Sequence, residues 1–249
     1  MANDPYVTLG AGYARARVPD SRIAAMIDAA LGNARSVVNV GAGAGSYEPE
    51  GRTVLAVEPS RTMIVQRPPG SAPAVQGVAE RLPVADRAFD AAMAILTTHH
   101  WSDLGAGLAE LRRVSGRQVV LTWDPALTSR FWLVEEYLPE IAERERRLAT
   151  LVAVRDGLER LGAMPTVLPV TVPGDCADGF TGAYWRRPEA YLDPGVRAGM
   201  STVMSLEPSR VQAAMRRLRD DLVSGRWHER HAHLLGEVTW DLGYRLVVA

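Results

Sequence analysis

The fold of this chain is decided by the stretch VVNVGAGAGSYEP, residues 37–49. Here a run of strand-forming residues ends in three closely spaced glycines, Gly41, Gly43 and Gly45. Glycine lets the backbone turn tightly after a strand and approach a ligand closely, and the N-terminus of a following helix offers unpaired amides. The stretch therefore predicts a strand-to-helix turn that binds a nucleotide-like ligand, although a tight loop without any ligand would use the same residues.

Outward from this turn, short β-branched runs alternate with helical patterns through the first half of the chain. This alternation is typical of a parallel sheet with crossover helices. Strands are expected at residues 36–40, 53–58, 74–77, 91–96, 118–123, 165–172 and 244–248. Helices are expected at 21–31, capped by Asp20, at 104–114, capped by Ser102, at 128–161 with a break at Pro139, and at 208–224.

The composition excludes several classes of protein. The chain has 249 residues and a formal net charge of −1, and all 28 of its basic residues are arginines balanced by 29 acids, which argues against nucleic acid as a partner. The single Cys176 excludes an internal disulfide and a multi-cysteine metal site. No signal-peptide core and no apolar run of membrane-spanning length is visible, so we expect a cytoplasmic location and no membrane partner.

A second motif indicates that the ligand contains an adenosine. Glu58 ends the second expected strand, where a carboxylate can accept both hydroxyls of a ribose. A nicotinamide dinucleotide would also use this arrangement, but its fingerprint is G-x-G-x-x-G/A, whereas this chain has G-x-G-x-G. Glu48, expected beside the helix start, would repel a pyrophosphate. S-adenosylmethionine (SAM) carries no phosphate and avoids that conflict.

Four motifs in order resemble the class I SAM-dependent methyltransferase family, particularly the ubiquinone and menaquinone biosynthesis branch. They are VGAGAG, AVEPS, GVAERLP and AFDAAMAILTTHHW, all within about residues 36–124. The resemblance implies an α/β, Rossmann-like fold with a doubly wound, mostly parallel seven-stranded sheet, helices on both faces, and a mainly helical or irregular cap. It implies one domain over residues 1–249, divided into an N-terminal arm and helix (1–35), a SAM-binding half (36–124) and an acceptor-binding cap half (125–249).

The resemblance also assigns the cofactor, SAM with S-adenosylhomocysteine (SAH) as product, and no metal. Asn39 stands where the family usually has an acid, so this position keeps a hydrogen-bond acceptor but loses the attraction to a cationic ligand. Arg17 is our candidate for the methionine carboxylate, with a solvated arginine as the alternative. The other expected contacts are Gly41, Ala42 and Gly43 along the methionine part, Glu58 on the ribose, Ala79 and Glu80 beside the adenine, Pro59 or Met63 over one face, and Leu96 and Thr97 near the sulfonium.

Methyl transfer from a sulfonium needs a nucleophile held in line, and often a base that removes its proton. His99 and His100 follow the fourth expected strand, at the carboxyl edge where doubly wound sheets bind ligands. Because successive strand residues point to opposite faces, one of the two should face the site. We expect His100 to be the candidate general base, and a neutral histidine that only orients the loop is the alternative.

The acceptor is expected to be a small organic molecule. The chain lacks the Asn/Asp-Pro-Pro-aromatic sequence common in enzymes that methylate the amino groups of DNA adenine and of glutamine. It also lacks the Pro-Cys nucleophile that attacks cytosine C5. Residues 175–193 are expected to form part of an acceptor pocket, although aromatics in such a segment also pack cores. The side chains expected to enclose the acceptor are Phe180, Tyr184, Trp185, Arg186 and Tyr191. A SAM-binding protein without turnover, a nicotinamide-dependent oxidoreductase, and a monomeric or homodimeric state stay open.

Overall fold

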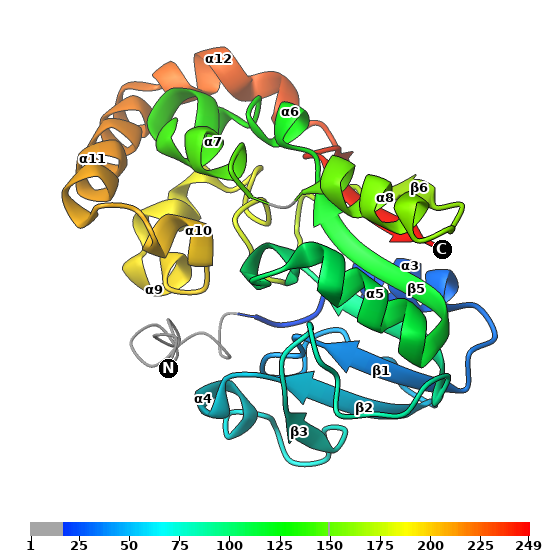
Figure 1. Ribbon diagram of the computed structural model, residues 1–249. Coiled ribbons are helices and arrows are strands. Elements are labelled where there is room, and N and C mark those ends of the chain that lie inside the picture. Colours follow the sequence, from blue (N-terminus) through cyan, green and yellow to red (C-terminus); the bar gives the residue numbers. More distant parts are fainter. Residues whose placement is uncertain (1–16, 149) are drawn as a thin grey trace.

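The computed structural model describes residues 17–148 and 150–249 of the chain, and its main feature is one seven-stranded sheet (Figure 1). Its strands are β1 (Ser36–Val40), β2 (Thr53–Glu58), β3 (Ala74–Gln76), β4 (Phe89–Ile95), β5 (Ser115–Trp123), β6 (Thr166–Pro169) and β9 (Tyr244–Val248). They lie in the order β3-β2-β1-β4-β5-β9-β6. Every neighbouring pair from β3 to β5 is parallel, and β9 is antiparallel to β5 and β6. The predicted mostly parallel seven-stranded α/β sheet is therefore confirmed.

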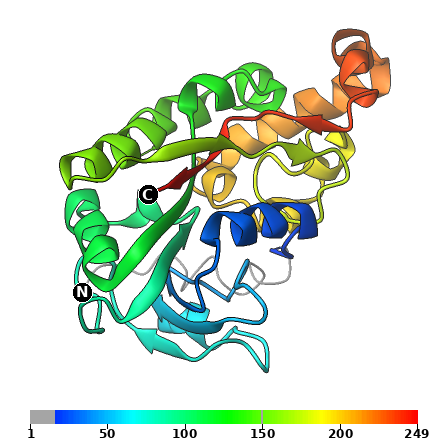
Figure 2. The ribbon, with the colours of Figure 1, turned by 90° about the vertical axis from the view of Figure 1, so that its right-hand side faces the viewer.

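Helices cover both faces of this sheet. Helix α3 (Ser21–Leu31) packs on one face, while α5 (Leu104–Val114) and α8 (Leu151–Arg160) pack on the other (Figures 1 and 2). A short helix, α4 (Arg61–Ile64), follows β2. Parallel strands joined by crossover helices are buried on both sides. The central strands therefore carry apolar residues on both of their faces.

The core confirms this two-sided burial. Val37 of β1 and Met93 of β4 are fully buried in the cluster that includes the apolar side of α3. Their neighbours Val38 and Ala92 are fully buried in the cluster under α5 and α8. The parallel register pairs Val37 with Ala91 and Val38 with Ala92, so both strands present the same alternation and a shift by one residue would exchange the two faces.

The second half of the chain adds a helical lobe at one end of the sheet (Figure 1). It contains α6 (Pro125–Thr128), the π-helical turn η2 (Leu133–Tyr137), α7 (Glu140–Glu145), the 3-10 helix η3 (Pro188–Leu192), α9 (Pro194–Arg197), α10 (Ser201–Met204), α11 (Pro208–Ser224) and α12 (Arg226–Leu235). A two-stranded sheet of β7 (Val172–Pro173) and β8 (Thr239–Trp240) joins it. Three fully buried tryptophans, Trp132, Trp185 and Trp227, fill its interior. Among the described helices, none is long and apolar enough to cross a membrane.

The helix expected after the glycine turn is absent, and this prediction is wrong. The described residues between β1 and β2 form only turns. Tyr47 has φ 62° although it is not a glycine, and the glycines at 41, 43 and 45 also have positive φ. A right-handed helix needs negative φ throughout, so this conformation prevents a helix from starting before Pro49. The glycine turn therefore presents loop amides instead of a helix N-terminus.

Several element boundaries also differ from the sequence predictions. Asp103, not Ser102, caps α5, since its carboxylate accepts from Ala106 N at 3.0 Å. The stretch 128–161 is divided into separate elements because Leu138 leaves the helical region, and Pro139 caps α7 as the expected break. The expected strand 165–172 is divided between β6 and the start of β7, and α12 and β8 were not predicted.

Candidate active site

A cavity of about 470 Å³ lies at the carboxyl ends of β1, β2 and β4. Its wall contains all twelve residues that the sequence analysis assigned to the cofactor, together with His100. The twelve are Arg17, Asn39, Gly41, Ala42, Gly43, Glu58, Pro59, Met63, Ala79, Glu80, Leu96 and Thr97. Eleven of them lie at or after the carboxyl ends of the parallel strands β1 to β4, which meet at the same edge of the sheet, whereas Arg17 precedes α3.

The glycine turn forms the floor of this cavity. Gly41 has φ 70°, and a Cβ at this position would lie 2.0 Å from Thr97 Oγ1. The amides of Gly41 and Ala42 donate to the Val57 carbonyl at 2.8 and 3.2 Å, which holds the turn against the end of β2. Only glycine fits this position, and the absence of a side chain leaves the backbone open to a ligand.

Glu58, at the end of the neighbouring strand β2, holds the glycine turn in place by hydrogen bonds. Its Oε2 accepts from Gly43 N at 2.8 Å and its Oε1 accepts from Ser60 N at 2.8 Å, and the residue is 5% exposed. A carboxylate accepts hydrogen bonds through both of its oxygens, and the ribose of an adenosine offers hydroxyl donors. Glu58 therefore shapes the cavity and also presents a carboxylate in its wall.

Asn39 is connected to Glu48 on the far side of the turn. Asn39 Nδ2 donates to Glu48 Oε1 at 3.3 Å, and Arg67 forms an ion pair with Glu48 Oε2 at 2.7 Å. Glu48 does not line the cavity. The expected repulsion between Glu48 and a pyrophosphate is therefore wrong, because an arginine neutralises this carboxylate outside the site.

Glu80 connects the adenine side of the cavity to α5. Its Oε1 accepts from Ser102 N at 2.6 Å, from Ser102 Oγ at 2.8 Å and from Asp103 N at 3.1 Å. Burial acts to raise the pKa of Glu80, but these hydrogen bonds and one from its own backbone outweigh burial and lower the pKa. Glu80 is thus an ionised anchor for the start of α5, and its contact with adenine stays a prediction.

The two histidines follow β4, as the sequence predicts, but they lie in a 3-10 turn and not in extended backbone. Strand β4 ends at Ile95, Leu96 adopts φ 51°, and the histidines follow in the 3-10 turn η1 (Thr98–His100). Their ring centroids are only 3.9 Å apart instead of lying on opposite faces of a strand. His100 lines the cavity, whereas His99 lies behind it and packs edge-on against Trp123 at 4.9 Å.

Both imidazoles favour the neutral form. Burial lowers the pKa of His100, and the positive charge of Arg144 lowers it further. The pKa of His99 falls well below its usual range, mainly because of burial and then because of His100 and Arg144. A neutral imidazole can accept a proton, so the chemistry of His100 is compatible with that of a base.

The cap residues expected to contact the acceptor do not line the cavity. Phe180, Trp185 and Tyr191 are buried core residues, and Trp185 Nε1 donates to the Val172 carbonyl at 3.0 Å. The remaining two residues of the predicted set are half-buried. Tyr184 carries the Arg187 guanidinium over its ring at 4.6 Å, and Arg186 donates to the Glu237 carbonyl at 2.8 Å. The interpretation of Phe180, Trp185 and Tyr191 as pocket residues is corrected, because the lobe uses them to fill its own interior.

The sequence analysis missed other residues of the cavity wall. Tyr47, Trp101 and Ser102 lie in it, and Asp178 contacts Arg17 from the cap. No periodic pattern marks these residues, since they lie in turns and loops that meet only in the tertiary structure. Among the described residues, no group of three or more His, Cys, Asp or Glu is arranged to hold a metal ion.

Comparison with known proteins agrees with this geometry. Residues 38–120 match the family model of a methyltransferase domain. The crystal structure of a putative methyltransferase from an antibiotic biosynthesis pathway of Anabaena variabilis ATCC 29413 is 33% identical, with 94% of this chain and 98% of that chain covered and a TM-score of 0.88. The chain belongs to the class I SAM-dependent methyltransferases.

More distant structures share the fold of this methyltransferase. YcgJ of Bacillus subtilis is 17% identical, with 92% of this chain and 97% of that chain covered and a TM-score of 0.54. Geranyl diphosphate C-methyltransferase of Streptomyces coelicolor A3(2) is 17% identical, with 92% and 77% covered and a TM-score of 0.53. The uncharacterized protein YafE of Escherichia coli K12 is 47% identical over 49 residues, which are 18% of this methyltransferase, and the match spans 24% of YafE.

Proposed function

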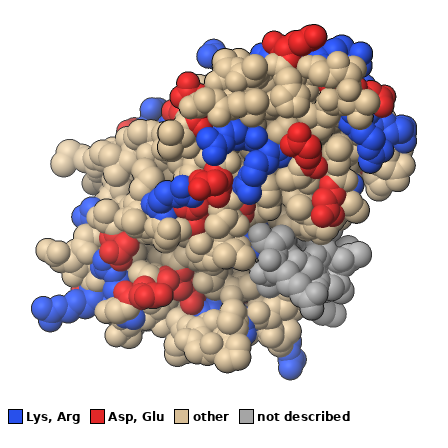
Figure 3. All heavy atoms as spheres, turned by 180° about the vertical axis from the view of Figure 1, so that it is seen from behind, with Lys and Arg blue, Asp and Glu red and all other residues tan. Residues whose placement is uncertain are grey.

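We propose that this methyltransferase moves the methyl group of SAM to a small organic acceptor. The observation that carries the proposal is the cavity in which the glycine turn, Glu58 and His100 meet. Its volume of about 470 Å³ lies within the range of about 300–1,000 Å³ that is usual for small-molecule sites. The interspersed arginine and acidic side chains on the face drawn in Figure 3 also favour a small molecule over a polyanion.

The residues present fit SAM. Gly41 lets the turn lie directly against Thr97 in the cavity wall, and the Glu58 carboxylate would accept from the ribose. Arg17 would pair with the methionine carboxylate, and Leu96 and Thr97 would lie near the sulfonium. When bound, SAM supplies an electrophilic methyl group, and the chain positions the nucleophile, excludes water and accepts a proton. No metal enters this proposal, and a cytoplasmic location stays a prediction.

The test of the cofactor site is the variant Glu58→Ala. It removes a carboxylate that accepts from Gly43 N and Ser60 N and is proposed to accept from the ribose, so buried donors lose their partner. We expect the affinity for SAH, measured by calorimetry, to fall by about 1–3 kcal/mol.

The matched control is Glu50→Ala, an exposed acid of the same loop outside the cavity wall, which should leave the affinity unchanged. An unchanged dissociation constant in Glu58→Ala would place the ribose elsewhere. No binding of SAH by the unmodified protein at millimolar concentration would remove the proposed function. Product analysis with labelled SAM separates an enzyme from a protein that only binds SAM.

The pH dependence tests His100 as the base. Its pKa in the folded protein lies below the ordinary value of 6.5, so the imidazole is neutral above that pH and becomes protonated only as the pH falls through the lowered pKa. We expect kcat to be constant down to about pH 6.5 and to fall below it, and His100→Gln to lower kcat by about 100-fold. The pH profile of methyl transfer from labelled SAM measures both effects. Loss of activity already above pH 7, or a His100→Gln variant with full activity, would show that this histidine only orients the loop.

A further inference from the structure

We propose that Asp178, in the cap, is a positioning residue that holds the Arg17 guanidinium in the cofactor cavity for the methionine carboxylate of SAM. The proposal rests on the proposed function, because it requires SAM or SAH in that cavity. Arg17 lines the cavity wall, whereas Asp178 lies behind it. Asp178 therefore acts on the ligand only through Arg17.

The contact between the two side chains is bidentate. Arg17 Nε donates to Asp178 Oδ1 at 2.7 Å, and Arg17 Nη2 donates to Asp178 Oδ2 at 3.1 Å. The side chain of Asp178 is 0% exposed and that of Arg17 is 11% exposed. Two parallel hydrogen bonds fix the plane of a guanidinium as well as its position, which a single contact does not do.

Two further donors complete the environment of Asp178. Gly179 N donates to Oδ1 at 2.7 Å, and the Tyr47 hydroxyl donates to Oδ2 at 2.9 Å. Burial raises the pKa of the Tyr47 phenol, and the Asp178 carboxylate raises it further, so the hydroxyl stays a donor. Each carboxylate oxygen of Asp178 accepts two hydrogen bonds from the protein, so its lone pairs are occupied. Asp178 is therefore suited to hold a neighbour and unsuited to bind the cofactor itself.

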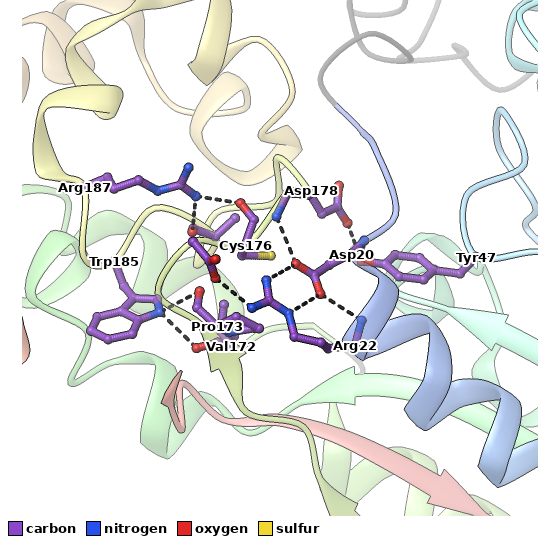
Figure 4. A network of polar contacts seen from close by, with 12 residues as sticks. Asp20, Arg22, Tyr47, Val172, Pro173, Cys176, Asp178, Trp185 and Arg187 are labelled. Carbon is purple, nitrogen blue, oxygen red and sulfur yellow. Dashed lines mark hydrogen bonds and ion pairs between the residues drawn. The ribbon is translucent and has the colours of Figure 1, made fainter. Parts of the chain in front are cut away.

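The turn that carries Asp178 is anchored to the start of α3, as Figure 4 shows. Ala177 N donates to Asp20 Oδ2 at 3.0 Å, and Asp20 N in turn donates to the Tyr47 hydroxyl at 3.4 Å. Arg22 joins the same turn by pairing with Asp20 and with Asp175, both at 2.7 Å. Tyr47 belongs to the glycine turn, so the start of α3, the cofactor loop and the cap meet at one buried point.

This arrangement determines how Arg17 can meet a ligand. Asp178 binds the edge of the guanidinium formed by Nε and Nη2, so it fixes the direction in which the other N–H groups of Arg17 point. An arginine side chain loses rotamer freedom when it binds a ligand, and Asp178 imposes that loss before the ligand arrives. We therefore expect Asp178 to strengthen the binding of the amino-acid part of the cofactor and not of its adenosine part.

The experiment compares two ligands in one variant. SAH carries the methionine-type carboxylate, whereas 5′-methylthioadenosine has the adenosine and sulfur without the amino-acid part. In Asp178→Asn we expect the dissociation constant for SAH, measured by calorimetry, to rise at least tenfold, and that for 5′-methylthioadenosine to change less than twofold. The matched control is Asp175→Asn, an exposed carboxylate of the same turn paired with Arg22, which should leave both constants unchanged.

Two more variants keep the test decisive. Arg17→Ala should weaken SAH binding selectively, and adding Asp178→Asn to it should cause no further loss. If Asp178→Asn does not fold, Tyr47→Phe removes one hydrogen bond to Asp178, and because Tyr47 also lines the cavity we expect it to weaken SAH about threefold more than 5′-methylthioadenosine. Equal losses for both ligands, or no loss for SAH, would overturn the inference. Failure of the unmodified protein to bind either ligand would instead overturn the proposed function.

Discussion

Replacing Trp185 by alanine is expected to lower the free energy of unfolding by about 3–5 kcal/mol, the usual cost of removing a buried tryptophan. Trp185 is 0% exposed, its Nε1 donates to the Val172 and Pro173 carbonyls at 3.0 and 3.2 Å, and its ring packs against Trp240 at 5.6 Å. The variant therefore leaves a cavity and two carbonyls without their donor. Denaturant unfolding, followed by far-ultraviolet circular dichroism, measures the change in the free energy of unfolding.

The control is the neighbouring Tyr184→Ala. Tyr184 is half-buried, so its replacement should cost about 1 kcal/mol, close to the centre of the distribution for single substitutions. If Trp185→Ala unfolded at the same denaturant concentration as the unmodified protein and lost only turnover of the acceptor, Trp185 would be a pocket residue and its assignment to the core would be refuted.

The second large effect is expected at Gly41. Gly41→Ala places a Cβ 2.0 Å from Thr97 Oγ1 and 2.8 Å from Thr97 Cβ, at a φ of 70°. The left-handed conformation costs about 1–2 kcal/mol for a residue with a side chain, and the overlap adds about 1–3 kcal/mol because the turn must move. We expect loss of about 2–5 kcal/mol of stability together with a loss of SAH binding of at least 100-fold, measured by calorimetry.

The variant Gly51→Ala separates the cost of the left-handed conformation from the cost of the overlap with Thr97. Gly51 lies in the same connection with φ 72°, but nothing lies within 4 Å of a Cβ built there. It should therefore show the conformational cost of about 1–2 kcal/mol alone, with SAH affinity unchanged. Equal behaviour of the two variants in SAH binding would mean that the close approach of Gly41 to Thr97 does not shape the cofactor cavity.

The sequence by itself determined the sheet and one half of the site. Two apolar runs predicted β1 and β2 with their observed bounds. A strand that is buried on both faces reads as a short, continuous apolar segment, which is easily recognised. The glycine turn follows one strand directly and Glu58 ends the next, so parallel pairing was enough to predict that they meet at one edge. The twelve predicted cofactor residues lie in one cavity wall for the same reason.

Tertiary structure alone decided the rest. Tyr47 and Leu96 have positive φ, which prevents the expected helix and makes a tight turn between β4 and the histidines. This unfavoured conformation depends on the packing that holds the two residues. Whether an aromatic such as Trp185 fills a core or lines a pocket depends on what surrounds it, and its residue type is the same in both cases. Asp178 lies 161 positions from Arg17, and no local pattern specifies a contact that forms only when the cap folds onto α3 and the glycine turn.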